Sequence, residues 1–196
     1  KLVYRAGLLH DVGKIGIDDE ILLKGDQLTH DEWVQLRMHP EFSYRILQAA
    51  EMEPVATWTR HHHEHYDGTG YPSQLEGQSI PLGSRIILVA DAFEAMTSDR
   101  VYRRALGMRQ AVEELRGGAG RQFDPQVVQT MVELVEAGVF TQVMQQYGRI
   151  VEPSLEAAPE QVVEQPAVPV TSTSEQQQAA AWAQQQIAQQ QPPQAA

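Results

Sequence analysis

The sequence contains no cysteine, so it can form neither disulfide bonds nor thiolate metal sites. It also lacks any window close to the roughly 20 consecutive apolar residues that span a bilayer. Its first residues, KLVYR, do not resemble a signal peptide. These absences are compatible with a reducing compartment. We therefore expect a cytoplasmic location and no membrane segment in this chain.

Basic residues are few: 15 Lys and Arg stand against 26 Asp and Glu, for a formal net charge of −11. Residues 151–196 contain five glutamates and neither Lys nor Arg, so residues 1–150 hold 21 acidic and 15 basic residues. Because long nucleic acids need a basic face, this balance argues against binding them. A small phosphorylated ligand stays compatible, since a few arginines or a metal cluster can reverse the field locally.

A regular spacing of aliphatic and aromatic residues extends from Leu2 to about Ile150 and does not continue beyond it. Residues 151–196 are of low complexity, rich in Gln, Ala and Pro, and cannot bury enough apolar surface to offset the entropy of ordering. We predict one domain over 1–150 and a disordered tail over 151–196. Because residues 2–9 are typical of the end of a helix and the first residue is not Met, we also expect sequence to precede Lys1.

Helix signals recur through the first 100 residues. Thr29–Glu32 has the spacing of a capping box, which predicts a helix start there. Pro40 and Pro54 suit the first turns of two further helices. An apolar stripe predicts a longer helix from Arg85 to about Ser98.

Residues 64–84 differ, because their glycines and prolines, Gly83 among them, oppose a helix and predict a long loop. Loops of this length without secondary structure are uncommon unless they are functional. Amphipathic helices are expected again over 108–116 and 125–136, the second with Asp124 as its N-cap. No stretch shows convincing strand alternation, so the predicted fold class is all-α.

Histidines and aspartates gather in four short segments of the sequence. Neutral imidazoles mixed with carboxylates suit divalent Fe, Mn, Zn or Ni. Each segment alone is ambiguous: a His-Asp pair at a helix end is commonly a cap, and consecutive histidines are commonly solvated. A carboxylate at position 91, inside an apolar helix, needs a partner if it is buried, and a metal would supply one. The candidates are His10, Asp11, His39, His62, His63 and Asp91.

Together these segments form motifs that resemble the HD-GYP family, a subgroup of the HD-domain metal-dependent phosphohydrolases. Residues 10–14 (HDVGK) match the signature HDxGK. Residues 62–64 (HHE) and 67–72 (DGTGYP) match the signatures HHE and DGxGYP. The similarity covers roughly residues 1–136 and continues through 80–81, 85–86, 90–95, 98–103, 120 and 123–125.

The resemblance implies an HD-type helical bundle with a long Gly/Pro-rich loop. It implies hydrolysis of cyclic di-GMP to pGpG, and in some members onward to GMP, in bacterial second-messenger signalling; certain relatives act on 3′,3′-cyclic GMP-AMP. The six candidates match the family's metal ligands, for two or three divalent ions, with Fe or Mn expected and Asp11 bridging. Lys14 matches a catalytic lysine near the scissile phosphate. Tyr71, Arg100 and Arg103 match residues near the ligand's phosphates and bases.

The resemblance also implies a further helix before residue 10, carrying another histidine ligand that this chain does not contain. Glu64 is expected to orient a ligand histidine, while His61 and His65 are not expected to be ligands. The expected partners are cyclic di-GMP, an upstream sensory or receiver domain, other signalling proteins and a second copy of the chain. The alternative function is a catalytically inactive cyclic di-GMP receptor or protein-docking module. A hydrolase acting on another nucleotide is disfavoured by the loop at 67–72.

Overall fold

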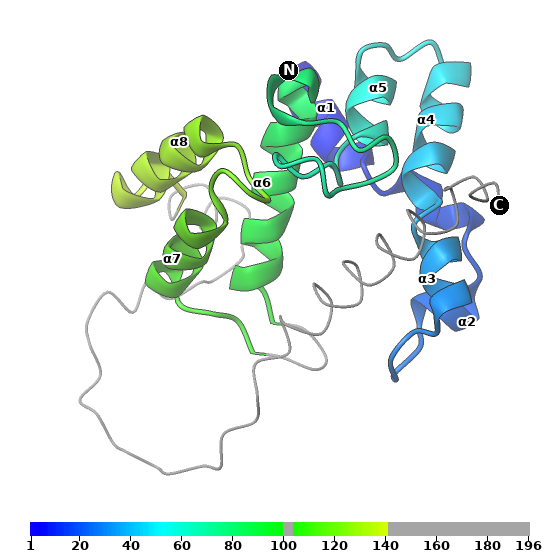
Figure 1. Ribbon diagram of the computed structural model, residues 1–196, viewed down its shortest axis with the longest axis horizontal. Coiled ribbons are helices and arrows are strands. Elements are labelled where there is room, and N and C mark those ends of the chain that lie inside the picture. Colours follow the sequence, from blue (N-terminus) through cyan, green and yellow to red (C-terminus); the bar gives the residue numbers. More distant parts are fainter. Residues whose placement is uncertain (100–103, 141–196) are drawn as a thin grey trace, which may run out of the picture. The chain divides into compact units, whose positions relative to one another are not determined.

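The computed structural model describes residues 1–99 and 104–140, and within them every regular element is helical (Figure 1). The prediction of an all-α fold is therefore confirmed. The α-helices are α1 (Leu2–Leu9), α2 (Asp19–Leu22), α3 (His30–Leu36), α4 (His39–Ala49), α5 (Val55–Arg60), α6 (Leu82–Thr97), α7 (Met108–Gly118) and α8 (Pro125–Glu136). Two short 3₁₀ helices are η1 (Val12–Gly16) and η2 (Gly77–Ser79).

Two helices begin at the caps that the sequence predicts. At α3 the Glu32 amide donates to Thr29 Oγ1 at 3.3 Å, and the Thr29 amide donates to Glu32 Oε2 at 2.6 Å. This reciprocal pair satisfies two amides that the first turn leaves without a helical partner. At α8 the Asp124 carboxylate accepts from the Gln126 amide at 2.7 Å. Pro40 occupies the first turn of α4, as expected.

Helix α6 begins at Leu82, three residues before the predicted start, so the interpretation of Gly83 as a helix breaker is wrong. Gly83 lies in the first turn of α6, against Trp58 of α5. A Cβ at this position would overlap the indole ring, so the glycine permits close packing of the two helices. The short elements η1 and α2 were not predicted either; Gly13 and Gly16 lie within η1.

Two hydrophobic cores lie along α6. The first core joins α6 to α1, α4 and α5. Its buried residues are Ala6, Leu47, Val55, Ala56 and Ile87. The second core joins α6 to α7 and α8, and its buried residues are Leu88, Val89, Phe93, Ala111, Val112, Leu115, Phe123, Val128 and Val132. Figure 1 shows α7 and α8 on one side of α6, with α1, α4 and α5 on the other.

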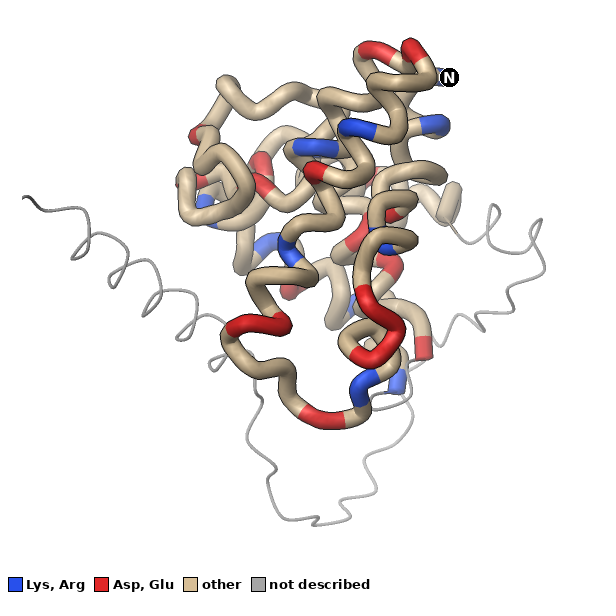
Figure 2. Tube along the Cα trace, turned by 90° about the vertical axis from the view of Figure 1, so that its right-hand side faces the viewer, with Lys and Arg blue, Asp and Glu red and all other residues tan. Residues whose placement is uncertain are grey.

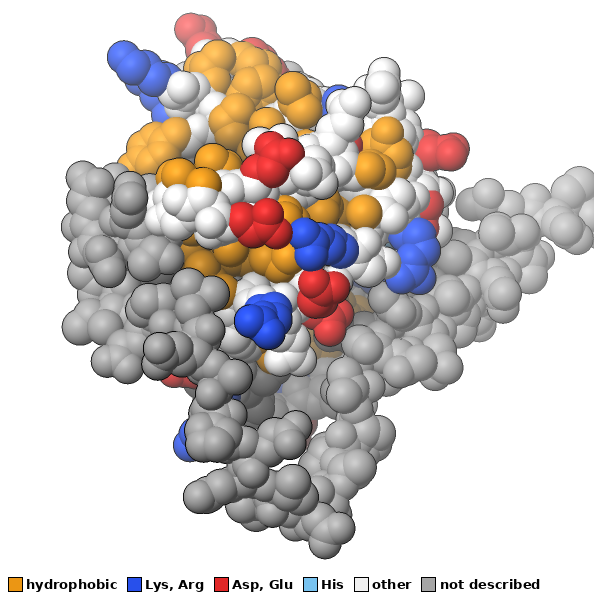
Figure 3. Space-filling view, turned by 90° about the vertical axis from the view of Figure 1, so that its left-hand side faces the viewer, with side chains coloured by type: hydrophobic (Ala, Val, Ile, Leu, Met, Phe, Trp, Pro, Cys, Tyr) orange, Lys and Arg blue, Asp and Glu red, His pale blue; other side chains and the backbone are white. Residues whose placement is uncertain are grey.

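The surface mixes charges and apolar side chains. Figure 2 shows acidic and basic positions interspersed along the described part of the chain. Figure 3 shows hydrophobic side chains gathered on the side of α7 and α8. An open apolar groove runs between α6 and α8, lined in part by Leu82, Ile86, Val127, Met131 and Leu134.

Among the described residues, no helix is both long and apolar enough to cross a membrane. The predicted tail at 151–196 lies outside the residues that the structure describes. The domain boundary near residue 150 and association with a second copy stay predictions.

Candidate metal centre

The structure brings the six candidate ligands together from four places in the fold. His10 and Asp11 lie between α1 and η1, and His39 is the first residue of α4. His62 and His63 lie in the turn that follows α5, while Asp91 lies in the middle of α6. The segments meet because α4 packs on η1 and α5, and α1 packs on α5 and α6.

Three imidazoles are oriented in the same way. The Nδ1 atom of each bonds the backbone carbonyl three residues earlier: His10 to Gly7 at 2.7 Å, His39 to Leu36 at 2.7 Å and His62 to Thr59 at 2.6 Å. With Nδ1 as the donor, Nε2 of each ring is left as a lone-pair acceptor. Fixing a ring through its other nitrogen is the usual arrangement around a ligating histidine.

Asp11 lies between two of these imidazoles. Its Oδ2 is 3.3 Å from His10 Nε2, and its Oδ1 is 3.3 Å from His39 Nε2. Lys14 Nζ contacts the same Oδ2 at 2.6 Å. On the far side of His10, Asp91 Oδ1 is 3.7 Å from Nε2. The two oxygens of Asp11 therefore face different histidines.

His62 and His63 complete the cluster. His63 Nε2 lies 3.2 Å from His39 Nε2, and the ring centroids of His62 and His63 are 4.0 Å apart. Two groups of three have ligand atoms within 4.8 Å of one another: His39, His62 and His63, and His10, Asp11 and His62. Such a set of mixed nitrogen and oxygen donors is what borderline divalent ions prefer.

The carboxylates attract positive charge to the cluster. Burial lowers the pKa of His10, but hydrogen bonds and charge from Asp11 and Asp91 outweigh it and raise the pKa to about 10. Burial raises the pKa of Asp11, yet the bonds from His10 and Lys14 hold it well below its usual range. The hydrogen bond from His10 likewise lowers the pKa of Asp91. The pull that raises the pKa of His10 would equally favour a divalent cation.

The other histidines are held in the neutral form that a ligand needs. Burial, the largest cause in each case, lowers the pKa of His62 to about 4 and lowers the pKa of His39 and of His63. Within the described residues, the Nε2 atom of His62 is buried with no hydrogen-bond partner. A buried acceptor without a partner costs about 1–3 kcal/mol. A bound metal ion would use this atom, so the residues present fit a metal centre.

Two further predicted residues lie at the edge of the cluster. The side chain of Lys14 is 42% exposed beside Asp11, which leaves its ammonium accessible to a ligand. The Tyr71 ring stacks on His63 with centroids 4.8 Å apart and an angle of 21°. Burial raises the pKa of Tyr71, which keeps its phenol neutral. Arg100 and Arg103 lie outside the described residues.

Arg37 is a neighbour of Tyr71 that the sequence did not reveal. Its guanidinium carbon is 4.9 Å from the centre of the Tyr71 ring and 5.8 Å from that of Trp33. Distances of this size suit cation–π attraction. The available signal was its position two residues before His39, which is weak without the fold.

Glu64 differs from its prediction. Its carboxylate accepts from the amides of Ser73 at 2.6 Å and Leu75 at 3.1 Å, and it lies 3.4 Å from His61 Nδ1. These three partners are not candidate ligands, so Glu64 holds the loop rather than a ligand histidine. His65 bonds Thr69 Oγ1 at 3.1 Å.

Ser43, one turn after His39 on α4, is a second residue that the sequence did not reveal. Its hydroxyl donates to the His10 carbonyl at 2.8 Å and accepts from the Gly13 amide at 2.9 Å. A Cβ at Gly13 would overlap the backbone of α4, so only glycine allows this approach. The hydroxyl thereby ties the turn carrying Asp11 to the helix carrying His39.

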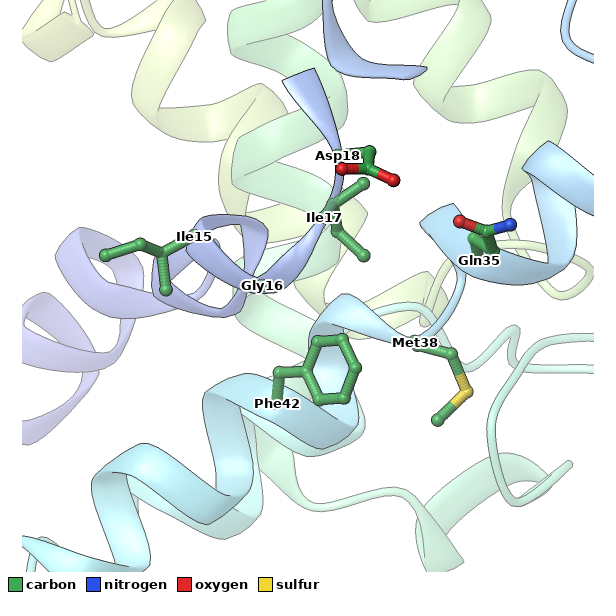
Figure 4. A pocket seen from close by; sticks show the side chains of 7 residues that line it. All are labelled: Ile15, Gly16, Ile17, Asp18, Gln35, Met38 and Phe42. Atoms are coloured by element: carbon green, nitrogen blue, oxygen red, sulfur yellow. The ribbon is translucent and has the colours of Figure 1, made fainter. Parts of the chain in front are cut away.

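The residues directly after Lys14, from Ile15 to Asp18, line an open pocket of about 320 Å³ (Figure 4). Phe42 of α4 and Met38, the residue before this helix, form one wall, and Asp18 and Gln35 supply the polar groups. Ile15 is 84% exposed at its rim. The pocket therefore combines apolar side chains with a carboxylate and an amide.

Several known proteins are similar to this chain in sequence, and one of known structure is similar to it in fold. A cyclic di-GMP phosphodiesterase of Vibrio cholerae is 38% identical over 144 residues, which are 69% of this chain and 29% of that protein. The cyclic di-GMP phosphodiesterase response regulator RpfG of Xanthomonas campestris is 41% identical over 135 residues, 67% of this chain and 36% of that protein. A 3′3′-cGAMP-specific phosphodiesterase of Vibrio cholerae is 37% identical over 135 residues, 67% of this chain and 26% of that protein. The chain thus spans about a third of the length of these curated relatives.

A crystal structure of a cyclic GMP-AMP-specific phosphodiesterase of Vibrio cholerae has the same fold, with a TM-score of 0.58 and 22% identity. The matched region covers 78% of this chain and 43% of the chain in that crystal structure. The profile of the HD domain family matches residues 2–127. Because that match takes in well over half of the sequence, the chain belongs to the HD domain family.

Proposed function

We propose that this chain is the catalytic region of a metal-dependent phosphodiesterase that hydrolyses cyclic di-GMP to pGpG; whether GMP follows is an outcome of the test below. The observation that carries the proposal is the convergence of six histidine and aspartate side chains beside Lys14 and Tyr71. Three relatives with identities of 37–41% are named for the hydrolysis of cyclic dinucleotides. Their names support the class of substrate.

The six ligands would hold two divalent ions, with Fe or Mn favoured by the mixture of imidazole and carboxylate. The two groups of three donors share His62, but one adds His39 and His63 and the other adds His10 and Asp11, which supports two neighbouring positions. Asp11 would bridge them, because its two oxygens face different histidines. Bound there, the ions would lower the pKa of water and offset the negative charge of the phosphodiester.

The chain's own residues would do the rest of the work. Hydrogen bonds from three Nδ1 atoms to backbone carbonyls fix the imidazoles before the substrate arrives, which avoids reorganisation during the reaction. The Lys14 ammonium, which contacts Asp11 Oδ2 at 2.6 Å, would stabilise charge that develops on a phosphodiester oxygen. The Tyr71 ring stacks on His63 beside the cluster, where it would contact a guanine of the dinucleotide.

The test is turnover of cyclic di-GMP by the purified chain, incubated without oxygen with Mn²⁺ or Fe²⁺ and followed by chromatography of pGpG and GMP. Asp11→Asn removes the carboxylate charge between the two ion positions and should abolish product. His30→Asn is the matched control, because His30 is exposed on α3, outside the cluster. The control should turn over substrate like the wild type.

Each outcome decides. Product that depends on metal and on Asp11 supports the phosphodiesterase. Tight binding of cyclic di-GMP without product would overturn catalysis and favour the receptor function. Neither binding nor product would overturn cyclic di-GMP as the ligand. Equal loss in the His30→Asn control would show that the assay reports folding rather than the site.

A further inference from the structure

The loop that carries Tyr71 lies directly on the turn that carries His62 and His63. The Tyr71 amide donates to the His63 carbonyl at 3.1 Å, in addition to the stacking of the two side chains. One residue earlier, a Cβ at Gly70 would overlap the backbone of residues 63–65. Backbone and ring contacts therefore place the tyrosine on a candidate ligand.

On the far side of Tyr71, the loop is held by a single buried carboxylate. The Glu64 side chain has no exposed surface. Its Oε1 accepts from the Ser73 amide and its Oε2 from the Leu75 amide, at 2.6 and 3.1 Å. The residue next to His63 thus reaches across to the segment that follows Pro72.

These two bonds matter because the loop has little other regular structure. Between residues 67 and 76 the described backbone forms no helix, and its ladder contact is the isolated bridge between Asp67 and Glu76. Bonds from a carboxylate to amides are charge-assisted and roughly twice as strong as neutral ones. Without the carboxylate, the amides of Ser73 and Leu75 would lose their protein acceptor and bond water instead, which would free this segment of the loop to move.

We propose that Glu64 is a positioning residue that holds Tyr71 on the His63 ring, so that the tyrosine is in place before a dinucleotide binds. The inference rests on the proposed function for what Tyr71 contacts, but the link between Glu64 and the loop does not. Glu64 acts through the loop and touches neither substrate nor metal.

The first experiment measures hydrogen exchange of backbone amides in the full chain, without substrate. Glu64→Gln keeps one acceptor oxygen but turns an NH₂ group toward an amide donor. Exchange at residues 71, 73 and 75 should rise about tenfold, since one well-made bond of this kind is lost. Glu53→Gln is the matched control: Glu53 is exposed and bonds Thr57, away from the loop. Glu64→Asp, which keeps the charge but shortens its reach, is the second variant in case the glutamine variant does not fold.

The second experiment measures kinetics with cyclic di-GMP. Glu64→Gln should raise KM about tenfold and change kcat less, because the ring is misplaced while the metal ligands stay. In a Tyr71→Ala background the same change should have little further effect, since the residue it positions is gone.

The two experiments separate the two proposals. Wild-type chain that is inert toward cyclic di-GMP would overturn the proposed function, and the exchange rates would still decide on Glu64. Unchanged exchange in both Glu64 variants would overturn the inference. So would a KM effect that persists in full in the Tyr71→Ala background, because Glu64 would then act by another route.

Discussion

The two cores along α6 differ in how many apolar side chains they bury and in whether buried polar side chains lie beside them. Among the residues that the structure describes, the second core buries nine apolar side chains, with Phe93 and Leu115 fully enclosed. The first core buries five, two of them alanines, and beside it lie buried polar side chains such as His39, Ser43 and His62. Apolar burial stabilises a fold in proportion to area. Buried polar groups cost free energy unless they are paired. We conclude that apolar packing holds α7 and α8, whereas the region around the cluster relies on hydrogen bonds and would be stabilised further by a bound cation.

The largest expected effect is the stabilisation of the chain by a cation bound at the cluster. Mn²⁺ at about 1,000 times its dissociation constant should stabilise the chain by about 4 kcal/mol, because it binds the folded cluster and not the unfolded chain. Thermal unfolding with added Mn²⁺, and again after chelation, measures the shift. Asp11→Asn should remove most of it. An equal shift in that variant would show that Mn²⁺ binds elsewhere and that the comparison between the cores is wrong.

A substitution in the second core should lower the stability of the chain without changing the effect of Mn²⁺. Leu115→Ala removes a fully buried side chain from α7 and should cost about 3 kcal/mol in the free energy of unfolding. The shift in stability on adding Mn²⁺ should stay that of the wild type, since no candidate ligand lies on α7 or α8. Urea unfolding with and without Mn²⁺ tests both statements. Leu134→Ala, at a side chain 43% exposed on α8, is the control and should change stability by less than about 0.5 kcal/mol.

The Ser43 side chain should contribute both to the stability of the fold and to the affinity of the cluster for metal. Ser43→Ala leaves the buried Gly13 amide and the His10 carbonyl without their partner, at a cost of about 2 kcal/mol. Because the turn that carries Asp11 is then free to shift, affinity for Mn²⁺ should fall roughly 10-fold or more. Calorimetric titration measures the affinity, and Ser79→Ala, at an exposed serine, is the control. Lost stability with unchanged affinity would make Ser43 a structural residue only.

The sequence predicted the parts of the fold whose signals are local. The bounds of α8 matched because Asp124 and Pro125 define its start through one cap. The start of α6 was missed because Gly83 looks like a breaker until Trp58 is seen to pack on it. A glycine that permits close packing and one that ends a helix are identical in sequence.

Long motifs named the six candidate ligands, which the structure brings together, whereas the contacts that hold the site in shape were not predicted. The bonds of Glu64 reach amides 9 and 11 residues ahead, and Ser43 bonds a turn 30 residues behind it. Amide donors carry no side-chain signature, so such bonds exist only once the chain is folded. Arg37 was missed for the same reason, since its neighbour Tyr71 comes from a distant loop.

The smallest expected effect lies away from both cores, at the start of α3. Hydrogen bonds from Lys24 and from the Thr29 amide hold the pKa of Glu32 below its usual value. Since the folded pKa is the lower one, the stabilisation is present above the unfolded pKa of about 4.3 and is lost as the pH falls through the folded value. The stability of Glu32→Gln should therefore lie below that of the wild type at pH 7 and approach it near pH 3, by urea unfolding across this range. Added salt should narrow the gap at pH 7, because the pair is near the surface. A gap of constant size at every pH would mean that the carboxylate's charge contributes nothing and that the cap alone starts the helix.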